Sequence, residues 1–266
     1  MHRPFNYGPV KDGWKVTRLR SFIFRRKVTN KPSLQLLSVN LPNGVVPRFE
    51  NDGRPAPAED LSGYQHVRVG DLVMNQLGKP HGSLGVSNYE GIIIPAYFVA
   101  EIDAEVAYPR FVHHLLRTRL YISEFERRGK YMPPSQFDIS WEQFRSIDVV
   151  LPPVQEQKVI ADFLDFELSR IDSIRMSRIR SIEHLMVFDI EWSKSLIEFF
   201  PFSQISTVLS SAGESGTSVT KNFAEDQLMA DLVSRIQGQI NLLSERRIAV
   251  SIAAISGELN VEKVSK

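Results

Sequence analysis

The chain has 266 residues, of which 42% are hydrophobic and 24% are charged, as in an ordinary globular protein. This length allows one large domain, or one domain with a substantial extension. The absence of cysteine excludes disulfides, thiolate zinc sites, iron–sulfur clusters and thiol nucleophiles. The richest apolar run, GIIIPAYFVA at 91 to 100, is too short to span a membrane, and the first residues do not form a secretory leader, so we expect a cytoplasmic protein.

The net charge of +1 hides an asymmetry between two parts of the chain. Residues 1 to 151 hold 20 Lys and Arg against 15 Asp and Glu, whereas residues 152 to 266 hold 12 against 16, so the net charges are +5 and −4. The segment WKVTRLRSFIFRRKVTNK, 14 to 31, has seven basic residues, no acidic residue, and the aromatic residues Trp14, Phe22 and Phe24. This pattern favours a first part that faces a polyanion, although charge also scatters unevenly in proteins without such a partner.

The first 151 residues predict a mostly β domain. Residues 1 to 60 are rich in Pro, Gly and Asn around short apolar stretches, which is typical of short strands and exposed loops. Between 64 and 102, the segments YQHVRV, LVMNQ, SLGVS and IIIPAYFVAEI predict an antiparallel meander whose last strand is long. Residues 109 to 129 predict one helix that begins at Pro109 and ends before Gly129. Ser140 and Gln143 resemble the capping box of a short helix.

The stretch IDVVLPPVQEQKVIADFLD, 147 to 165, changes character at two adjacent prolines. Residues 147 to 151 suit a buried strand, and apolar residues recur at helical spacing from Val154. Pro152 favours extended geometry at Leu151, and Pro153 fits the first turn of a helix. The junction therefore predicts a domain edge from which a helix departs.

Two long amphipathic segments follow the prolines, at 154 to 198 and 223 to 259. Their apolar stripes comprise Ile160, Leu164, Leu168, Ile171, Ile174, Ile182 and Leu185 in the first segment, and Met229, Leu232, Ile236, Ile240, Leu243, Val250 and Ile255 in the second. Between them, residues 203 to 220 contain six Ser, three Thr and two Gly, as in a flexible linker. A helix of this length needs a second helix against which to bury its stripe, so the two segments predict an antiparallel coiled coil.

The fold class expected is α+β, with a mostly β domain followed by paired long helices. We expect a recognition domain at 1 to 151, a spacer helix at 152 to 200, a linker at 201 to 222, and a second helix with a tail at 223 to 266.

Four segments resemble the specificity (S) subunit of type I restriction-modification systems. GDLVMNQLGKPHGSLGVSNYEGIIIPAYFV, 70 to 99, is similar to the β-core of the family's target-recognition domains. RRGKYMPPSQFDISWEQFRSIDVVLPPVQEQKVIADFLD, 127 to 165, is similar to the end of such a domain and to the LPP-x-x-EQ start of its conserved helix. LSRIDSI, 168 to 174, continues that helix, and INLLSERRIAVSIAAISGEL, 240 to 259, resembles the end of a second one.

The resemblance implies a subunit that recognises double-stranded DNA, has no catalytic activity and needs no cofactor or metal. It also implies methyltransferase subunits as partners, docked on the helices, and a restriction and translocation subunit reached through them. The residues expected in helix pairing or partner docking are Ile160, Leu164, Leu168, Ile171, Ile182, Leu185, Ile236, Ile240 and Leu243. Family members usually carry two recognition domains, whereas this sequence has one, so we expect either self-association or pairing with another specificity chain.

Two catalytic sequence motifs that would contradict this expectation are absent. The chain has no GxxxxGK phosphate loop and no [DNS]PP[YF] amino-methyltransferase tetrapeptide. Asp189, Glu191 and Lys194 have a nuclease-like spacing, but they lie in a helical stripe and are better explained as a solvated face. His113 and His114 are adjacent on a predicted helix and point in different directions, which argues against a shared metal ion.

Two polar loops carry residue types that contact phosphates and base edges. NQLGKPHGS, 75 to 83, joins two predicted strands, and RRGKYMPPSQ, 127 to 136, follows the predicted helix. The candidate DNA-binding residues are Asn75, Gln76, Lys79, His81, Ser83, Arg127, Arg128, Lys130, Tyr131 and Gln136. An alternative from another class is a non-enzymatic coiled-coil interaction protein whose basic head binds protein or RNA.

Overall fold

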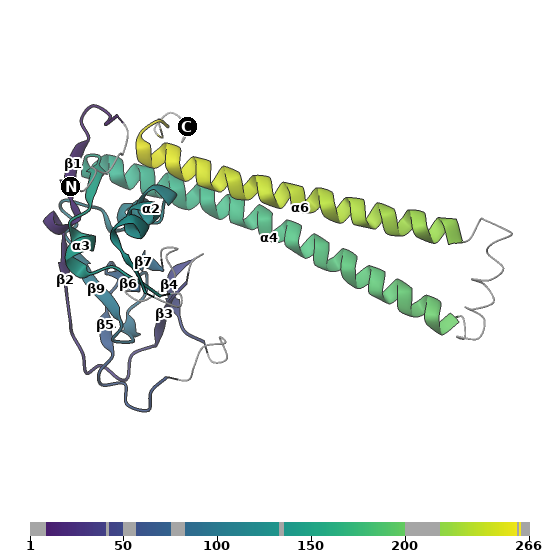
Figure 1. The fold of residues 1–266 in the computed structure, drawn as a ribbon, viewed down its shortest axis with the longest axis horizontal. Coiled ribbons are helices and arrows are strands. Elements are labelled where there is room, and N and C mark those ends of the chain that lie inside the picture. The colour runs from purple at the N-terminus through teal and green to yellow at the C-terminus, as the bar shows by residue number, and fades with distance from the viewer. Residues whose placement is uncertain are drawn as a thin grey trace. The chain divides into compact units, whose positions relative to one another are not determined.

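The computed structural model describes residues 9–40, 43–49, 57–75, 83–132, 136–199, 219–259 and 261, with the side chains of 130–138, 185–199 and 219–229 left aside. The chain divides into two compact units, one formed by residues 1–165 with 250–266 and the other by 166–249. Within the described residues, none of the helices combines the length and the apolar character of a membrane span. Figure 1 shows the strands and short helices of the first unit and the two long helices.

The first unit contains the strands and short helices. Its strands are β1 (Lys15–Arg18), β2 (Ile23–Arg25), β3 (Leu37–Asn40), β4 (Gly44–Pro47), β5 (Gln65–Val67), β6 (Leu72–Asn75), β7 (Leu84–Val86), β8 (Gly91–Ile93), β9 (Tyr97–Ile102), β10 (Lys130–Met132), β11 (Gln136–Asp138) and β12 (Asp148–Leu151). Its short helices are η1 (Leu19–Ser21), α1 (Pro109–Leu116), α2 (Arg119–Arg128) and α3 (Trp141–Arg145). The long helices are α4 (Val154–Phe199) and α6 (Val219–Ser256).

The strands pair antiparallel, as expected, but they do not form a simple meander. A four-stranded sheet has the order β2-β9-β6-β7, and the pairs β1-β12, β3-β4, β5-β8 and β10-β11 are two-stranded. The expected long strand at 92 to 102 is wrong, because it is interrupted around Pro95 into β8 and β9. Proline has no backbone N–H for a ladder, which allows β8 to leave the sheet and pair with β5.

The single helix expected at 109 to 129 is also wrong, because it breaks at Thr118 into α1 and α2. Thr118 has an extended backbone, with φ of −71° and ψ of 152°. Its backbone N–H and its hydroxyl both donate to the Leu115 carbonyl, at 3.2 and 2.9 Å. A threonine side chain that bonds locally to the backbone competes with helix continuation, which explains the break.

Packing of the first unit buries strand and helix faces together. The cluster around the central strands contains Leu37, Val39, Val45, Val67, Val73, Ile93, Tyr97 and Val99. Gly44 in β4 and Gly85 in β7 let these two strands approach closely. A Cβ added to Gly85 would lie only 2.9 Å from the Cα of Gly44, so a side chain there would push the strands apart. Helix α1 packs against this region through β7, which also contacts β4.

The second unit, residues 166–249, is an antiparallel helical pair, as Figure 1 shows for α4 and α6. Leu168, Ile171, Ile236 and Ile240 are buried, while Asp172 pairs across the helices with Arg247 at 3.2 Å. Ile174 and Leu232 belong to the predicted stripes, yet they are 40% and 41% exposed. The antiparallel coiled coil is confirmed, but its buried seam is narrower than the apolar stripes in the sequence.

The other predicted residues of the helices differ in burial, and some lie outside the description. Ile160 and Leu164 are buried within the first unit, and Ile182 and Leu243 are half-buried. The side chain of Leu185 and those of Asp189, Glu191 and Lys194 lie outside the described residues. The second helix begins at Val219, within the predicted linker, and residues 200–218 lie outside the description.

Candidate nucleic-acid interface

The first candidate loop joins the ends of β6 and β7. Asn75 closes β6 and donates its backbone N–H to the Ser83 carbonyl at 2.9 Å, so these two predicted residues form the base of the loop. Gln76, Lys79 and His81 lie outside the described residues. The sheet supports this base on one side, because Asn75 is also in register with Tyr97 of β9.

Helix α1 supports the same base on the other side, through the edge of β7. The Val86 N–H donates to Nδ1 of His113 at 3.2 Å, and Arg117 Nη1 donates to the Leu84 carbonyl at 2.7 Å. Burial, with the positive charge of Arg117 nearby, lowers the pKa of His113 well below its usual value. A neutral His113 can accept the Val86 bond, so burial keeps this residue in the form that the contact requires.

His114 faces a different partner and connects α1 to the start of α4. Its Nε2 lies 2.8 Å from Asp165, which also accepts two bonds from Arg110 Nε at 2.8 and 2.9 Å. Burial alone would raise the pKa of Asp165, but the hydrogen bonds from His114 and Arg110 hold it well below its usual value. The adjacent histidines thus serve two separate contacts, and no cluster suited to a metal ion occurs among the described residues.

The second candidate loop belongs to the hairpin β10-β11. The strands are in register from Lys130 opposite Asp138 to Met132 opposite Gln136. The backbones of Lys130, Tyr131 and Gln136 therefore lie in the hairpin, while their side chains are outside the description. Gly129 ends α2 immediately before the hairpin and donates its N–H to the Phe125 carbonyl at 2.9 Å.

Arg127 and Arg128, which the sequence offers as DNA contacts, already have a protein partner. Both bind Glu124, with Arg127 Nε and Nη2 at 2.7 Å and Arg128 Nε at 2.5 Å. Glu124 is only 3% exposed, and although burial would raise its pKa, the two arginines lower it. A buried carboxylate needs such partners, so part of the positive charge of this loop neutralises Glu124. A DNA contact by either arginine stays a prediction.

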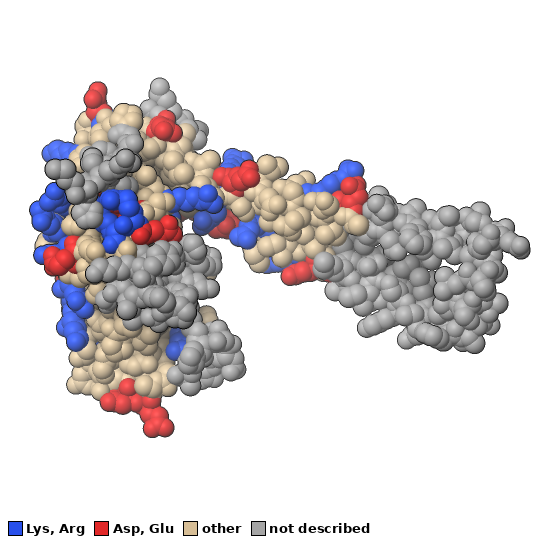
Figure 2. Space-filling view, in the orientation of Figure 1, with Lys and Arg blue, Asp and Glu red and all other residues tan. Residues whose placement is uncertain are grey.

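The basic segment 14 to 31 lies along β1, η1 and β2. Lys15, Arg20, Arg25, Lys27 and Lys31 are exposed. Arg18 pairs with Asp148, and Arg26 with buried Asp71. Figure 2 shows Lys and Arg gathered along the side of the domain where β1 and β2 lie in Figure 1. Phe24 is 52% exposed, whereas Trp14 and Phe22 are buried, so the aromatic residues of this segment serve mainly the core.

The LPP-x-x-EQ motif fastens α4 to the domain. Gln157 is fully buried, and its side-chain oxygen accepts the Tyr108 N–H at 2.7 Å while its nitrogen donates to the carbonyls of Val106 and Pro152. Glu156 accepts bonds from Lys11 at 2.7 Å and from the Trp14 indole at 3.1 Å. The motif thus has a structural role in this chain, because Glu156 and Gln157 each join α4 to an earlier segment.

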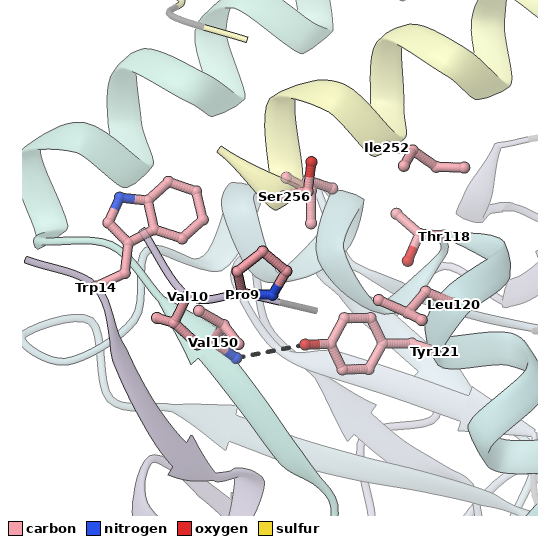
Figure 3. A pocket seen from close by; sticks show the side chains of 10 residues that line it. Pro9, Val10, Trp14, Thr118, Leu120, Tyr121, Val150, Ile252 and Ser256 are labelled. Carbon is pink, nitrogen blue, oxygen red and sulfur yellow. Dashed lines mark hydrogen bonds between the residues drawn. The ribbon is translucent and has the colours of Figure 1, made fainter. Parts of the chain in front are cut away.

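A small apolar recess lies near the start of the domain, where Trp14, Leu120, Tyr121 and Ile252 are among its lining residues (Figure 3). The Tyr121 hydroxyl accepts the Val150 N–H at 3.4 Å at its edge. None of the described residues that line the recess is charged. Its lining is mostly apolar and uncharged, so it is not suited to binding phosphates.

Comparisons with known proteins find solved structures of similar architecture. No family model and no curated protein matches the chain. Among solved structures, a chain from a type I R-M system, studied for its complex assembly and conformational transition, is 17% identical with a TM-score of 0.54, and the match covers 73% of this chain and 51% of that one. The HsdS subunit from Thermoanaerobacter tengcongensis is 20% identical with a TM-score of 0.48, covering 72% and 50%.

The S subunit of the type I system from M. genitalium is 12% identical with a TM-score of 0.44, covering 79% of this chain and 52% of its own. The present chain spans about half the length of these solved chains. The first of these matches shows a shared fold at low sequence identity. The chain therefore shares its fold with about half of a chain from a type I restriction-modification system, and the resemblance in its sequence is confirmed at the level of that fold.

Proposed function

We propose that this chain is a DNA sequence-recognition (specificity) subunit of a type I restriction-modification system. The observation that carries the proposal is the shared fold, in which a mostly β domain with supported polar loops precedes an antiparallel helical pair. In this role the chain selects the DNA site and performs no catalysis itself. The methyltransferase subunit supplies the S-adenosylmethionine site and extrudes the adenine, and the restriction subunit acts at the same complex.

Charge supports DNA as the partner of the first domain. Residues 1 to 151 carry a net charge of +5, and the exposed cations along β1, η1 and β2 add to the basic residues of the two loops. Such cations neutralise phosphates and position a domain on the duplex, while loop side chains discriminate bases. The acidic second part, with a net charge of −4, suits protein docking better than contact with DNA.

A duplex-binding assay tests this proposal. A pool of duplexes with a randomised segment identifies the preferred sequence, and fluorescence anisotropy then measures affinity between 50 and 200 mM salt. About four phosphate contacts would lower affinity about a hundredfold over this range. An affinity independent of salt, or the selection of no sequence, would contradict DNA recognition and would favour the protein- or RNA-binding alternative.

Lysines of the two loops offer the cleaner mutational test of phosphate contact. Replacing Lys79 and Lys130 with Ala should weaken binding to a similar extent on every sequence and reduce the salt dependence. Adding Arg127→Ala and Arg128→Ala should weaken binding further. That larger effect would include the cost of leaving Glu124 buried without a partner, because both arginines bind it. The double lysine variant therefore isolates the DNA contribution.

A bipartite target needs a second recognition domain, and we propose that two copies of this 266-residue chain supply it together. Identical readers related by a two-fold axis imply an interrupted palindrome. Purification with the methyltransferase subunit, followed by mass measurement and sequencing of methylated sites, tests the arrangement. An asymmetric, unsplit motif from a complex with one copy of the chain would reject the dimer in favour of a monomer or of pairing with another specificity chain.

A further inference from the structure

The two ends of the β10-β11 hairpin are joined by one side-chain amide. Gln143 lies in α3, beyond the hairpin, and its Oε1 accepts the Ser140 N–H at 3.0 Å. Its Nε2 donates to the Arg128 carbonyl at 3.0 Å. Arg128 lies just before the hairpin and Ser140 just after it, so this one amide bridges both ends of the segment 129 to 139.

The orientation of the amide is fixed by its partners. A backbone N–H can only donate and a carbonyl can only accept, so the oxygen of Gln143 must face Ser140 and its nitrogen must face Arg128. The Ser140 hydroxyl in turn accepts the Gln143 N–H at 3.2 Å, which completes the capping box of α3. Gln143 therefore combines a helix cap, made with its oxygen, and a link across the hairpin, made with its nitrogen.

Neighbouring contacts hold the same two ends. The Arg128 side chain binds Glu124 through Nε and the Ser146 hydroxyl through Nη1 at 2.7 Å. That hydroxyl donates to the Gln143 carbonyl at 2.8 Å. Ile139, at the end of the hairpin, is 1% exposed and fixed in the core. The hairpin is thus mounted on α2 and α3, which also contact each other through the rings of Phe125 and Phe144.

We propose that Gln143 is a positioning residue for DNA sequence discrimination, acting through the β10-β11 hairpin rather than by touching DNA. The inference rests on the proposed function. A reading element discriminates bases only when its backbone is held in one arrangement, because geometric looseness weakens base contacts more than phosphate contacts. Loss of the link to Arg128 should therefore lower sequence discrimination while leaving general duplex affinity near its original value.

Glutamate at this position separates the two roles of the residue. Gln143→Glu keeps an oxygen for the Ser140 N–H, and glutamate is itself a normal capping-box residue. It loses the donor to the Arg128 carbonyl and places a carboxylate against that oxygen. Ser140→Ala is the matched control, because it removes an acceptor from the cap and leaves both bonds of the Gln143 amide. Gln143→Ala removes the cap bond and the link together.

The experiment compares the full-length chain and these variants on the duplex selected by the wild type and on a scrambled duplex of equal length. For Gln143→Glu we expect the ratio of the two affinities to fall about tenfold, in the range that one bidentate base contact supplies. Ser140→Ala should keep the wild-type affinity ratio but lower Tm. Gln143→Ala should lower both the affinity ratio and Tm.

Two outcomes would overturn the inference. One is a wild-type affinity ratio in Gln143→Glu, and the other is an unchanged ratio in Gln143→Ala once its Tm is shown to lie above the assay temperature. Faster hydrogen exchange of the 130 to 138 amides in Gln143→Glu, with unchanged exchange in the central strands, is the expected structural counterpart. A wild-type chain that selects no sequence would instead overturn the proposed function.

Discussion

Gln157 offers the sharpest test of how the long helix α4 is attached to the β domain. Its side chain is fully buried and serves three backbone groups, namely the Tyr108 N–H at 2.7 Å and the carbonyls of Pro152 at 2.9 Å and Val106 at 3.1 Å. The perturbation is Gln157→Leu, which preserves the approximate size of the side chain but removes its oxygen and nitrogen. All three backbone groups then lose a partner.

The expected loss can be worked from these contacts. A buried polar group left without a partner costs about 1–3 kcal/mol. The bond to the Pro152 carbonyl is buried, so its loss carries the full cost. The bonds to Tyr108 and Val106 are partly buried, so water can replace them in part and lower the cost of losing them. We therefore expect a loss of about 3 kcal/mol in the free energy of unfolding, or a fall of about 6–12 °C in Tm.

Urea denaturation followed by tryptophan fluorescence measures this loss, because Trp14 and Trp141 lie in the first unit. The matched control is Gln155→Leu, on the same turn of α4, where the side chain is exposed and the expected change is within about 0.5 kcal/mol. A change below about 0.5 kcal/mol in Gln157→Leu, equal to that of the control, would refute the claim that these bonds attach α4 to the domain.

Two further predictions concern the core histidine and the helical pair. Burial and the positive charges of Arg117, His114 and Arg110 depress the folded pKa of His113, and the opposing effect of Asp165 is smaller. The unfolded chain therefore binds a proton first as pH falls below about 6.5. Stability should drop by about 1 kcal/mol between pH 7.5 and 5.5 in urea titrations, and His113→Gln should flatten that dependence; an equally steep profile would contradict it. Ile171→Asp or Ile240→Asp should lower the helical melting temperature by circular dichroism, because a buried charge costs several kcal/mol, whereas Ile174→Asp on an exposed position should change little. Equal effects of Ile171→Asp and Ile174→Asp would contradict the buried seam.

Local sequence signals predicted the parts of the fold that depend on local chemistry. The capping box of Ser140 and Gln143 is present, the strand before the prolines ends at Leu151, and α4 begins at Val154. Each of these depends on residues only a few positions apart. The break at Thr118 and the interruption at Pro95 were also visible as residue types, but whether a threonine or proline ends an element depends on packing that local patterns do not contain.

The helical stripes show the same limit in the coiled coil. Ile171 and Ile174 are equally apolar and three residues apart, so periodicity placed both in the apolar stripe of the first helix. The structure buries Ile171 and leaves Ile174 40% exposed. An apolar stripe about 100° wide is broader than the contact that two helices make, so a stripe in sequence overstates the seam.

Arg127 and Arg128, at the end of α2, explain why candidate DNA contacts are harder to predict than the fold. Sequence shows Arg127 and Arg128 as free positive charge in a polar loop, because Glu124 lies one turn earlier in a helix and looks like a solvated acid. Burial of Glu124 reverses that interpretation, since a carboxylate removed from water recruits the nearest guanidinium groups. The same pairing fixes the backbone from which the hairpin starts. An arginine proposed as a DNA contact can therefore act instead by holding the hairpin that we propose reads the duplex, and the Gln143 variants test this positioning role.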